Sequence, residues 1–142
     1  MKLVRSVNVA ANPKKVFDYL SDFTTTTEWD PGTVSTVRVS GDGGVGTVYE
    51  NRSRLAGRES ALTYVVTEIR PSESITLRGH NDSVVAVDTM TFEPVGKGTR
   101  VTYTANFTFK GAAKLAAPFL CPAFKKLGDE AEAGLQEHLG KL

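Results

Sequence analysis

Apolar and polar residues alternate at the start of the chain and again through its middle. Over Lys2–Val9 the alternation has the period of a half-buried β-strand. From residue 33 onward the sequence is rich in β-branched residues and is interrupted by short turns that contain glycine, proline or asparagine. The strands expected there are Thr33–Val39, Gly46–Leu55, Arg58–Ile69, Ser74–Arg78, Ser83–Glu93 and Thr99–Phe109. Because their connections are short, we expect antiparallel hairpins.

Two segments have the period of a helix instead. Asn12 and Pro13 suit the N-cap and the first helical position, and the apolar residues that follow predict a short helix from Pro13 to about Ser21. Thr24–Thr27 supports at most a brief helix before the turn that begins at Trp29.

The C-terminal segment predicts a long amphipathic helix. Its apolar face is formed by Leu120, Phe124, Leu127, Ala131, Leu135 and His138. We expect some five turns from about Ala123, entered through a kinked turn because Pro118 and Pro122 lie near the start.

Taken together, the elements predict an α+β fold: a seven-stranded curved antiparallel sheet with a short helical insert after the first strand and one long terminal helix. The sheet must cover its apolar face, and the last helix is the only long apolar one. A curved sheet wrapped around that helix leaves a space between them that suits a ligand. At 142 residues, we expect a single ligand-binding domain over residues 1–142.

Composition narrows the function classes. With 40% hydrophobic residues, 23% charged residues and a net charge of +1, the chain is typical of a globular protein and not of one built to grip nucleic acid. One cysteine excludes an internal disulfide framework. No apolar stretch is long enough for stable membrane insertion, and Met1–Arg5 lacks the apolar core of a signal peptide. We expect a cytoplasmic protein, and a monomer or a homodimer.

Short segments in a particular order extend over nearly the whole chain. They are Ala10–Leu20, the Trp29 loop, Gly44–Thr47, Val66–Pro71, Phe92–Pro94, Gly98–Val101 and Leu127–Glu130 leading into Leu135. In order and spacing they resemble the START-like, or SRPBCC, superfamily with its helix-grip fold, and most of all its polyketide cyclase/dehydrase branch. The resemblance implies a hydrophobic cavity between sheet and terminal helix, used for an apolar or aromatic small molecule. Because that superfamily includes lipid carriers, cyclases and hormone receptors, the resemblance alone does not imply a reaction.

Asp88 is the first candidate for chemistry. By strand alternation it shares a face with Ala86, Met90 and Phe92, where a buried acid would have a raised pKa and could act as a general acid or base. The alternative is that Val85 and Val87 face inward and Asp88 is solvated or paired with an arginine. The rarity of buried charged residues favours this second interpretation.

Three aromatic residues have two interpretations each. Trp29, before a Pro-Gly turn, could stack on a ligand or plug one end of the core. Tyr64 and Tyr103 could orient a substrate with their hydroxyls, although a core tyrosine bonded to backbone or water is the favoured interpretation. The candidate catalytic residues are Asp88, Tyr64 and Tyr103.

The candidate ligand-binding residues are Trp29, Tyr64, Asp88, Met90, Phe92, Tyr103, Phe107, Phe124 and Leu127. Further cavity walls are expected from Phe17, Leu20 and Leu135.

Other chemistry-bearing residues favour structural roles. The strand arginines Arg52, Arg54, Arg78 and Arg100 are expected on the outer face, most of them paired with Glu50, Glu68 or Glu93, although any one could bind a ligand carboxylate. Cys121 is interpreted as a buried structural thiol. The glycine-rich loop 41–46 is interpreted as a hairpin loop and a candidate rim of the cavity.

The two histidines give no metal site. His80 is expected in an exposed turn, and His138 near the fraying end of the terminal helix, although it could face the cavity. They lie far apart and lack a carboxylate at a ligating spacing, so we expect neither a metal nor another cofactor.

Three functions remain open. The first is binding of a hydrophobic or aromatic, lipid- or polyketide-like small molecule in the cavity. The second is an enzyme of the polyketide cyclase/dehydrase kind, in which polar cavity residues move protons. The third is a protein-interaction module without a ligand.

Overall fold

All 142 residues are described in a computed structural model, and they form one sheet and four helical segments. The sheet is antiparallel and has the spatial order β1-β7-β6-β5-β4-β3-β2. Its strands are β1 (Lys2–Val9), β2 (Thr33–Ser40), β3 (Val48–Leu55), β4 (Arg58–Arg70), β5 (Ser74–His80), β6 (Val84–Val95) and β7 (Gly98–Phe109). The helical segments are α1 (Pro13–Leu20), the 3₁₀ turn η1 (Phe23–Thr25), α2 (Thr26–Trp29) and α3 (Ala113–Leu139). This confirms the predicted α+β helix-grip architecture with seven strands.

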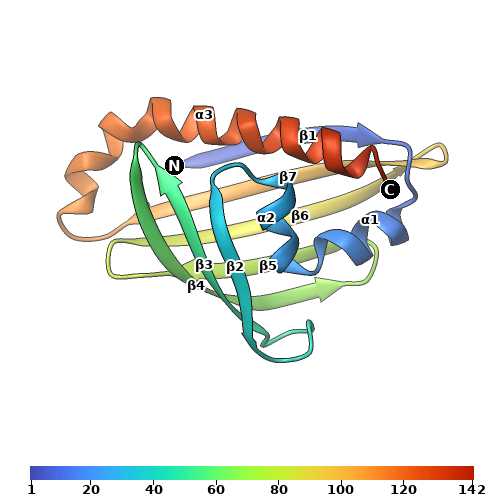
Figure 1. Cartoon of the computed structure of the whole chain (residues 1–142), viewed down its shortest axis with the longest axis horizontal. Helices are drawn as coiled ribbons and strands as arrows, with labels where there is room; N and C mark the ends of the chain where they lie inside the picture. Colours follow the sequence, from blue (N-terminus) through green and yellow to red (C-terminus); the bar gives the residue numbers. More distant parts are fainter.

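The sheet curves around α3. A register shift between Val66 and Glu68 places a bulge in β4, and two more shifts interrupt the pairing of β2 with β3, devices that bend and twist strands. The terminal helix lies along β1 and β7, while α1 and α2 lie near its C-terminal end (Figure 1). Two helical layers therefore cover one end of the sheet, and α3 alone covers the other.

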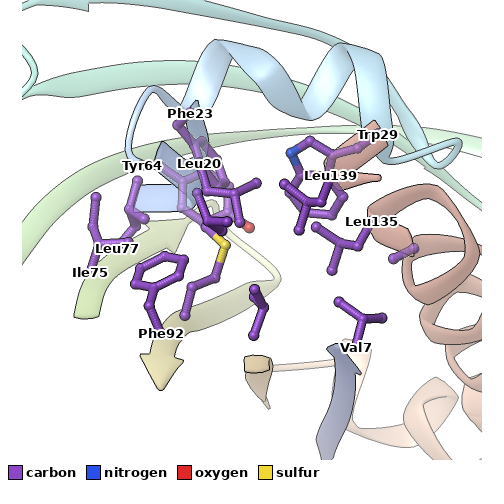
Figure 2. Packing of buried hydrophobic residues seen from close by; sticks show 14 of the residues in the cluster. Val7, Leu20, Phe23, Trp29, Tyr64, Ile75, Leu77, Phe92, Leu135 and Leu139 are labelled. Atoms are coloured by element: carbon purple, nitrogen blue, oxygen red, sulfur yellow. The ribbon is translucent and has the colours of Figure 1, made fainter. Parts of the chain in front are cut away.

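The covered end is a solid core. Figure 2 shows Leu20 of α1, Phe23 of η1 and Trp29 of α2 between the sheet and the end of α3, where Leu135 and Leu139 point inward. The five side chains are at most 2% exposed. At Gly134 the backbone of α3 passes so close to the Trp29 carbonyl that any Cβ would overlap it. Glycine therefore sets the distance between α3 and α2.

The start of α3 differs from the prediction. The helix begins at Ala113, not near Ala123, and has 27 residues, with Pro118 and Pro122 inside it. Each proline withholds one amide from the carbonyl four residues earlier, which usually breaks a buried helix. Both prolines are exposed here, so water can satisfy the freed carbonyls and the helix continues. No helix of the structure is long and apolar enough to cross a membrane.

Candidate functional site

A cavity of about 690 Å³ lies between the sheet and the first half of α3. Its inner end is formed by Trp29, Tyr64, Asp88 and Tyr103. Its aromatic wall consists of Phe107, Phe109 and Phe124, with the Phe124 ring centroid 4.7 Å from that of Phe107 and 5.7 Å from that of Phe109. The rim includes the turn between β3 and β4, the residues Asn81, Ser83 and Val84, and the first turns of α3. The glycine-rich loop 41–46 is a hairpin loop, as predicted, but it does not line the cavity.

Small residues make room at the inner end. Tyr64 on β4 pairs in register with Gly79 on β5, which in turn pairs with Ala86 on β6. A Cβ at Gly79 would lie only 2.6 Å from the Tyr64 ring. Because that position has no side chain, the ring can lie across β5 toward the cavity.

Asp88 is the central polar group of the cavity. Its side chain is 3% exposed, so the solvated orientation that the rarity of buried acids favoured is wrong. Ala86, Met90 and Phe92 face inward with it, as the strand alternation predicted. The Tyr103 hydroxyl donates a hydrogen bond to Oδ2 at 3.0 Å, so this tyrosine meets a carboxylate and not backbone or water. The other carboxyl oxygen, Oδ1, is buried without a hydrogen-bond partner.

The environment changes the acidity of these groups. Burial raises the pKa of Asp88 to about 7, an effect increased by the charge of Asp30 and opposed by the hydrogen bond from Tyr103. The Tyr64 hydroxyl also lies near enough to oppose the rise in this pKa, although its geometry falls short of a hydrogen bond to Oδ1. Burial and the Asp88 charge raise the pKa of both tyrosines well above the usual value. The tyrosines therefore remain proton donors at neutral pH, whereas Asp88 exists in both protonation states.

Asp30 is a second acid that sequence reasoning missed. It lines the cavity, and burial raises its pKa although the amide of Gly32 and the hydroxyl of Thr33 donate to its carboxylate at 3.0 Å each. In the sequence it looked like an ordinary turn residue before Pro31. The signal available in the sequence was the adjacent Trp29, itself a candidate cavity residue.

A buried polar network on β2 and β3 was also missed. Asn51 donates from its amide to the Thr36 hydroxyl at 2.9 Å, and the hydroxyls of Thr36 and Thr26 lie 2.6 Å apart. Ser53 donates to the side-chain carbonyl oxygen of Asn51 at 2.7 Å. Asn51, Ser53 and Thr26 line the cavity. The sequence signal was present, since Asn51 lies two residues from the inward-facing Tyr49 on one strand.

Most of the predicted ligand-binding residues line this cavity, but not all. Those that do are Trp29, Tyr64, Asp88, Tyr103, Phe107, Phe124 and Leu127. Met90 and Phe92 do not; they lie in the solid core at the other end of the sheet. The expected wall residues Phe17, Leu20 and Leu135 are also part of that packed region. The cavity is shifted along α3 toward its N-terminus because α1 and η1 fill the remaining space.

Trp29 plugs one end of the core, as one of its two interpretations predicted, and its stacking on a ligand stays a prediction. It is 1% exposed, its indole nitrogen donates to the Thr25 hydroxyl at 3.3 Å, and its ring meets Tyr103 edge-on at 5.9 Å between centroids. It also lines the cavity. The residue therefore closes the core and forms the inner wall.

The remaining candidates lie outside the inner cavity. Arg52 pairs with Glu59 at 2.9 Å and Arg100 with Glu93 at 3.9 Å, both partly exposed to solvent, while Arg54 lies at the cavity rim. His138 contacts the Gly134 carbonyl through Nδ1 at 3.0 Å and does not line the cavity.

Cys121 is exposed, so its interpretation as a buried thiol is wrong. It belongs to α3 and is open to solvent. The prediction from the sequence missed this because it started the helix near Ala123, after this cysteine.

A curved antiparallel sheet closed over a cavity by one terminal helix defines the helix-grip class of the START-like superfamily. The family profile described as "Polyketide cyclase / dehydrase and lipid transport" matches residues 1–140, and the chain belongs to this family.

Several solved structures share this fold. The protein TTHA0849 from Thermus thermophilus superimposes with a TM-score of 0.82 at 17% identity, over 98% of this chain and 97% of that one. The Zhui aromatase/cyclase from Streptomyces sp. R1128 gives 0.83 at 15% identity, over 98% and 93%. A START superfamily protein from Mycobacterium smegmatis gives 0.81 at 13% identity, over 99% and 97%. A search among curated protein sequences gave no match. At these identities the structures show a shared fold.

Proposed function

We propose that this protein binds an apolar or aromatic small molecule that carries one hydroxyl or carbonyl group at its buried end. The observation that supports this most directly is the unpartnered Oδ1 of Asp88, a residue that lines a predominantly apolar cavity of about 690 Å³. A buried carboxyl oxygen without a partner is costly, and a ligand group bonded to it would remove that cost. The volume is typical of small-molecule sites.

The protonation state of Asp88 matches two ligand groups. When ionised, Oδ1 accepts a hydrogen bond from a phenol or an enol; when protonated, the carboxyl donates to a ketone. Because its pKa is about 7, both forms are populated near neutral pH. The aromatic side chains Phe107, Phe109 and Phe124 would hold the rest of the molecule by apolar burial and ring contacts.

A hydroxyl comparison tests this proposal. We expect the wild type to bind 2-naphthol roughly tenfold more tightly than naphthalene, the difference that one satisfied buried hydrogen bond provides. In Asp88→Ala the two affinities should converge, as measured by fluorescence titration. Ser35→Ala, a change on β2 outside the cavity, serves as the matched control. Equal affinities for the two compounds in the wild type would contradict the proposal.

A second function, proton transfer of the cyclase/dehydrase kind, is favoured by the contact of Tyr103 with Asp88. An ionised Asp88 would remove a proton from a carbon next to a ketone, and the hydroxyl of Tyr103 or Tyr64 would donate a hydrogen bond to the enolate oxygen. Similarity to the Zhui aromatase/cyclase supports the same idea.

The test of this second function is turnover of a linear poly-β-ketone. Asp88→Asn should abolish turnover while binding is retained. Unchanged turnover in that variant would contradict an acid–base role.

A further inference from the structure

The first half of α3 presents an unusual apolar surface to solvent. Phe119 is 84% exposed and Leu115 is 78% exposed, more than any other large hydrophobic side chain of the chain. The exposed Pro118 and Pro122 share the same side of the helix, because they recur at spacings of three and four residues. Neither Leu115 nor Phe119 contributes to the core, so folding does not explain them.

The opposite side of the same helix segment faces the cavity. Its cavity-lining residues are Ala113, Ala116, Leu120, Phe124 and Leu127. A single helix therefore separates the cavity from the exposed apolar surface. Figure 1 shows that this part of α3 extends beyond the α1 and α2 layer, at the end of the molecule farthest from the C-terminus.

The surrounding charge is basic. Residues 110 to 128 include four lysines and no acidic residue. Lys126 pairs with Glu130 at 3.8 Å, whereas Lys110, Lys114 and Lys125 form no ion pair.

The cavity rim adds to this positive charge. Arg54 and Arg58 lie there, also without ion pairs. The acids at the same end are Glu59, which is paired with Arg52, and Asp82. Unpaired cations therefore outnumber free acids around the cavity opening.

We propose that Leu115, Phe119, Lys110, Lys114 and Lys125, the "mouth patch", dock this protein on an anionic lipid bilayer surface. Two large apolar side chains on the exposed side of one helix, flanked by lysines, have the pattern of an interfacial helix that inserts its apolar side chains and binds acidic headgroups with its cations. A protein partner would need a shaped pocket for Phe119, whereas a bilayer accepts a projecting side chain directly.

Docking would place the first turns of α3, which form part of the cavity rim, at the lipid surface. An apolar ligand could then pass between the bilayer and the cavity without crossing water. This last step rests on the proposed function, but the docking itself does not.

Vesicle co-sedimentation tests the docking. We expect the wild type to bind phosphatidylcholine vesicles that contain phosphatidylglycerol, and to bind pure phosphatidylcholine vesicles much more weakly. Leu115→Ser/Phe119→Ser and Lys114→Glu/Lys125→Glu should each lower the partition coefficient roughly tenfold or more, with the binding also weakened by salt. The matched control is Val37→Ser/Val39→Ser, which removes two exposed apolar side chains from β2 and should bind like the wild type.

The only cysteine provides a second readout. Cys121 is exposed on the flank of the mouth patch, so a thiol-reactive, polarity-sensitive fluorophore there should shift to the blue when anionic vesicles are added. The same fluorophore on Ser40→Cys in a Cys121→Ser background, on β2, should not shift.

Three results would overturn the proposal: no binding of the wild type to anionic vesicles, equal binding of the Leu115→Ser/Phe119→Ser variant, or a dimer that this variant converts to a monomer while vesicles are not bound. The last result would show that a second copy of the chain covers the patch. Asp88→Ala separates this proposal from the previous one, because it should lose the preference for 2-naphthol and keep its vesicle binding.

Discussion

The two ends of the space between the sheet and α3 are built from the same two elements, yet one end is solid and the other is hollow. At the solid end, α1 and η1 insert Val16, Leu20 and Phe23 between the sheet and the helix. At the hollow end no helix is inserted, and α3 presents alanines at 113 and 116 to the cavity. The helical segments between β1 and β2 therefore determine which end of the space is packed and which end remains a cavity.

The helix itself shows the same division. All of its buried residues lie from Phe124 onward, and none lies among the eleven residues from Ala113 to Ala123. The second half of α3 therefore stabilises the fold, while the first half is free to cover a ligand and to face a partner surface. The buried residues of α3 therefore lie in one half of the helix, and the surfaces proposed for binding lie in the other.

The largest expected effect is on stability, when the same leucine-to-alanine substitution is made at the solid end and at the hollow end. Leu135→Ala in the solid core should lower the free energy of unfolding by about 2–5 kcal/mol, because it leaves a cavity among well-packed neighbours. Leu127→Ala at the cavity wall should cost no more than about 1 kcal/mol, since that leucine is only partly buried. Urea denaturation of both variants measures the difference. Equal losses would mean that the two ends are packed alike.

The sequence predicted those features of the solid and hollow ends that depend on local patterns, and missed those that depend on contacts between distant residues. The strands, and the antiparallel hairpins from residue 33 onward, followed from alternation and short turns, which are local properties. The side that Asp88 faces also followed from alternation with Ala86 and Met90, but the general rarity of buried acids argued against it. Its partner Tyr103 lies on the next strand, opposite Met90, and only the register of β6 with β7 brings the two together.

The errors have physical causes as well. Met90 and Phe92 were expected in the cavity because periodicity gives a face of the sheet and not a position along it. The early start of α3 and the exposure of Cys121 were missed because proline is read as a helix breaker, a rule that fails where the helix surface is open to water.

The pH dependence of stability should arise at the hollow end, from the titration of Asp88. The folded protein holds the Asp88 proton up to a pKa of about 7, whereas the unfolded chain releases it near the ordinary value of 3.8. The folded state therefore binds more protons in this window, and the free energy of unfolding falls as the pH rises. Between about pH 5 and pH 7 we expect a fall of about 2 kcal/mol in the wild type.

Asp88→Asn should flatten this dependence, because the amide does not titrate. A smaller dependence of the same sign should remain from Asp30, whose pKa burial also raises. Thermal unfolding at several pH values from about 5 to 8 measures both proteins, and Asp18→Asn, at an exposed position on α1, is the control. Parallel curves for the wild type and Asp88→Asn would place the titrating group elsewhere.

The smallest effect on stability is expected for the exposed apolar side chains in the first half of α3. Leu115 and Phe119 leave water only slightly on folding, so Leu115→Ser/Phe119→Ser should change the free energy of unfolding by no more than about 0.5 kcal/mol, apart from the small difference in helix propensity. In the proposed docking, these two side chains contact a lipid surface and not the protein's own core. Urea denaturation of the double variant, measured without lipid beside Leu135→Ala, checks this. A loss comparable to that of Leu135→Ala would show that the first half of α3 is part of the core after all, and that the division between the two ends of the helix does not hold.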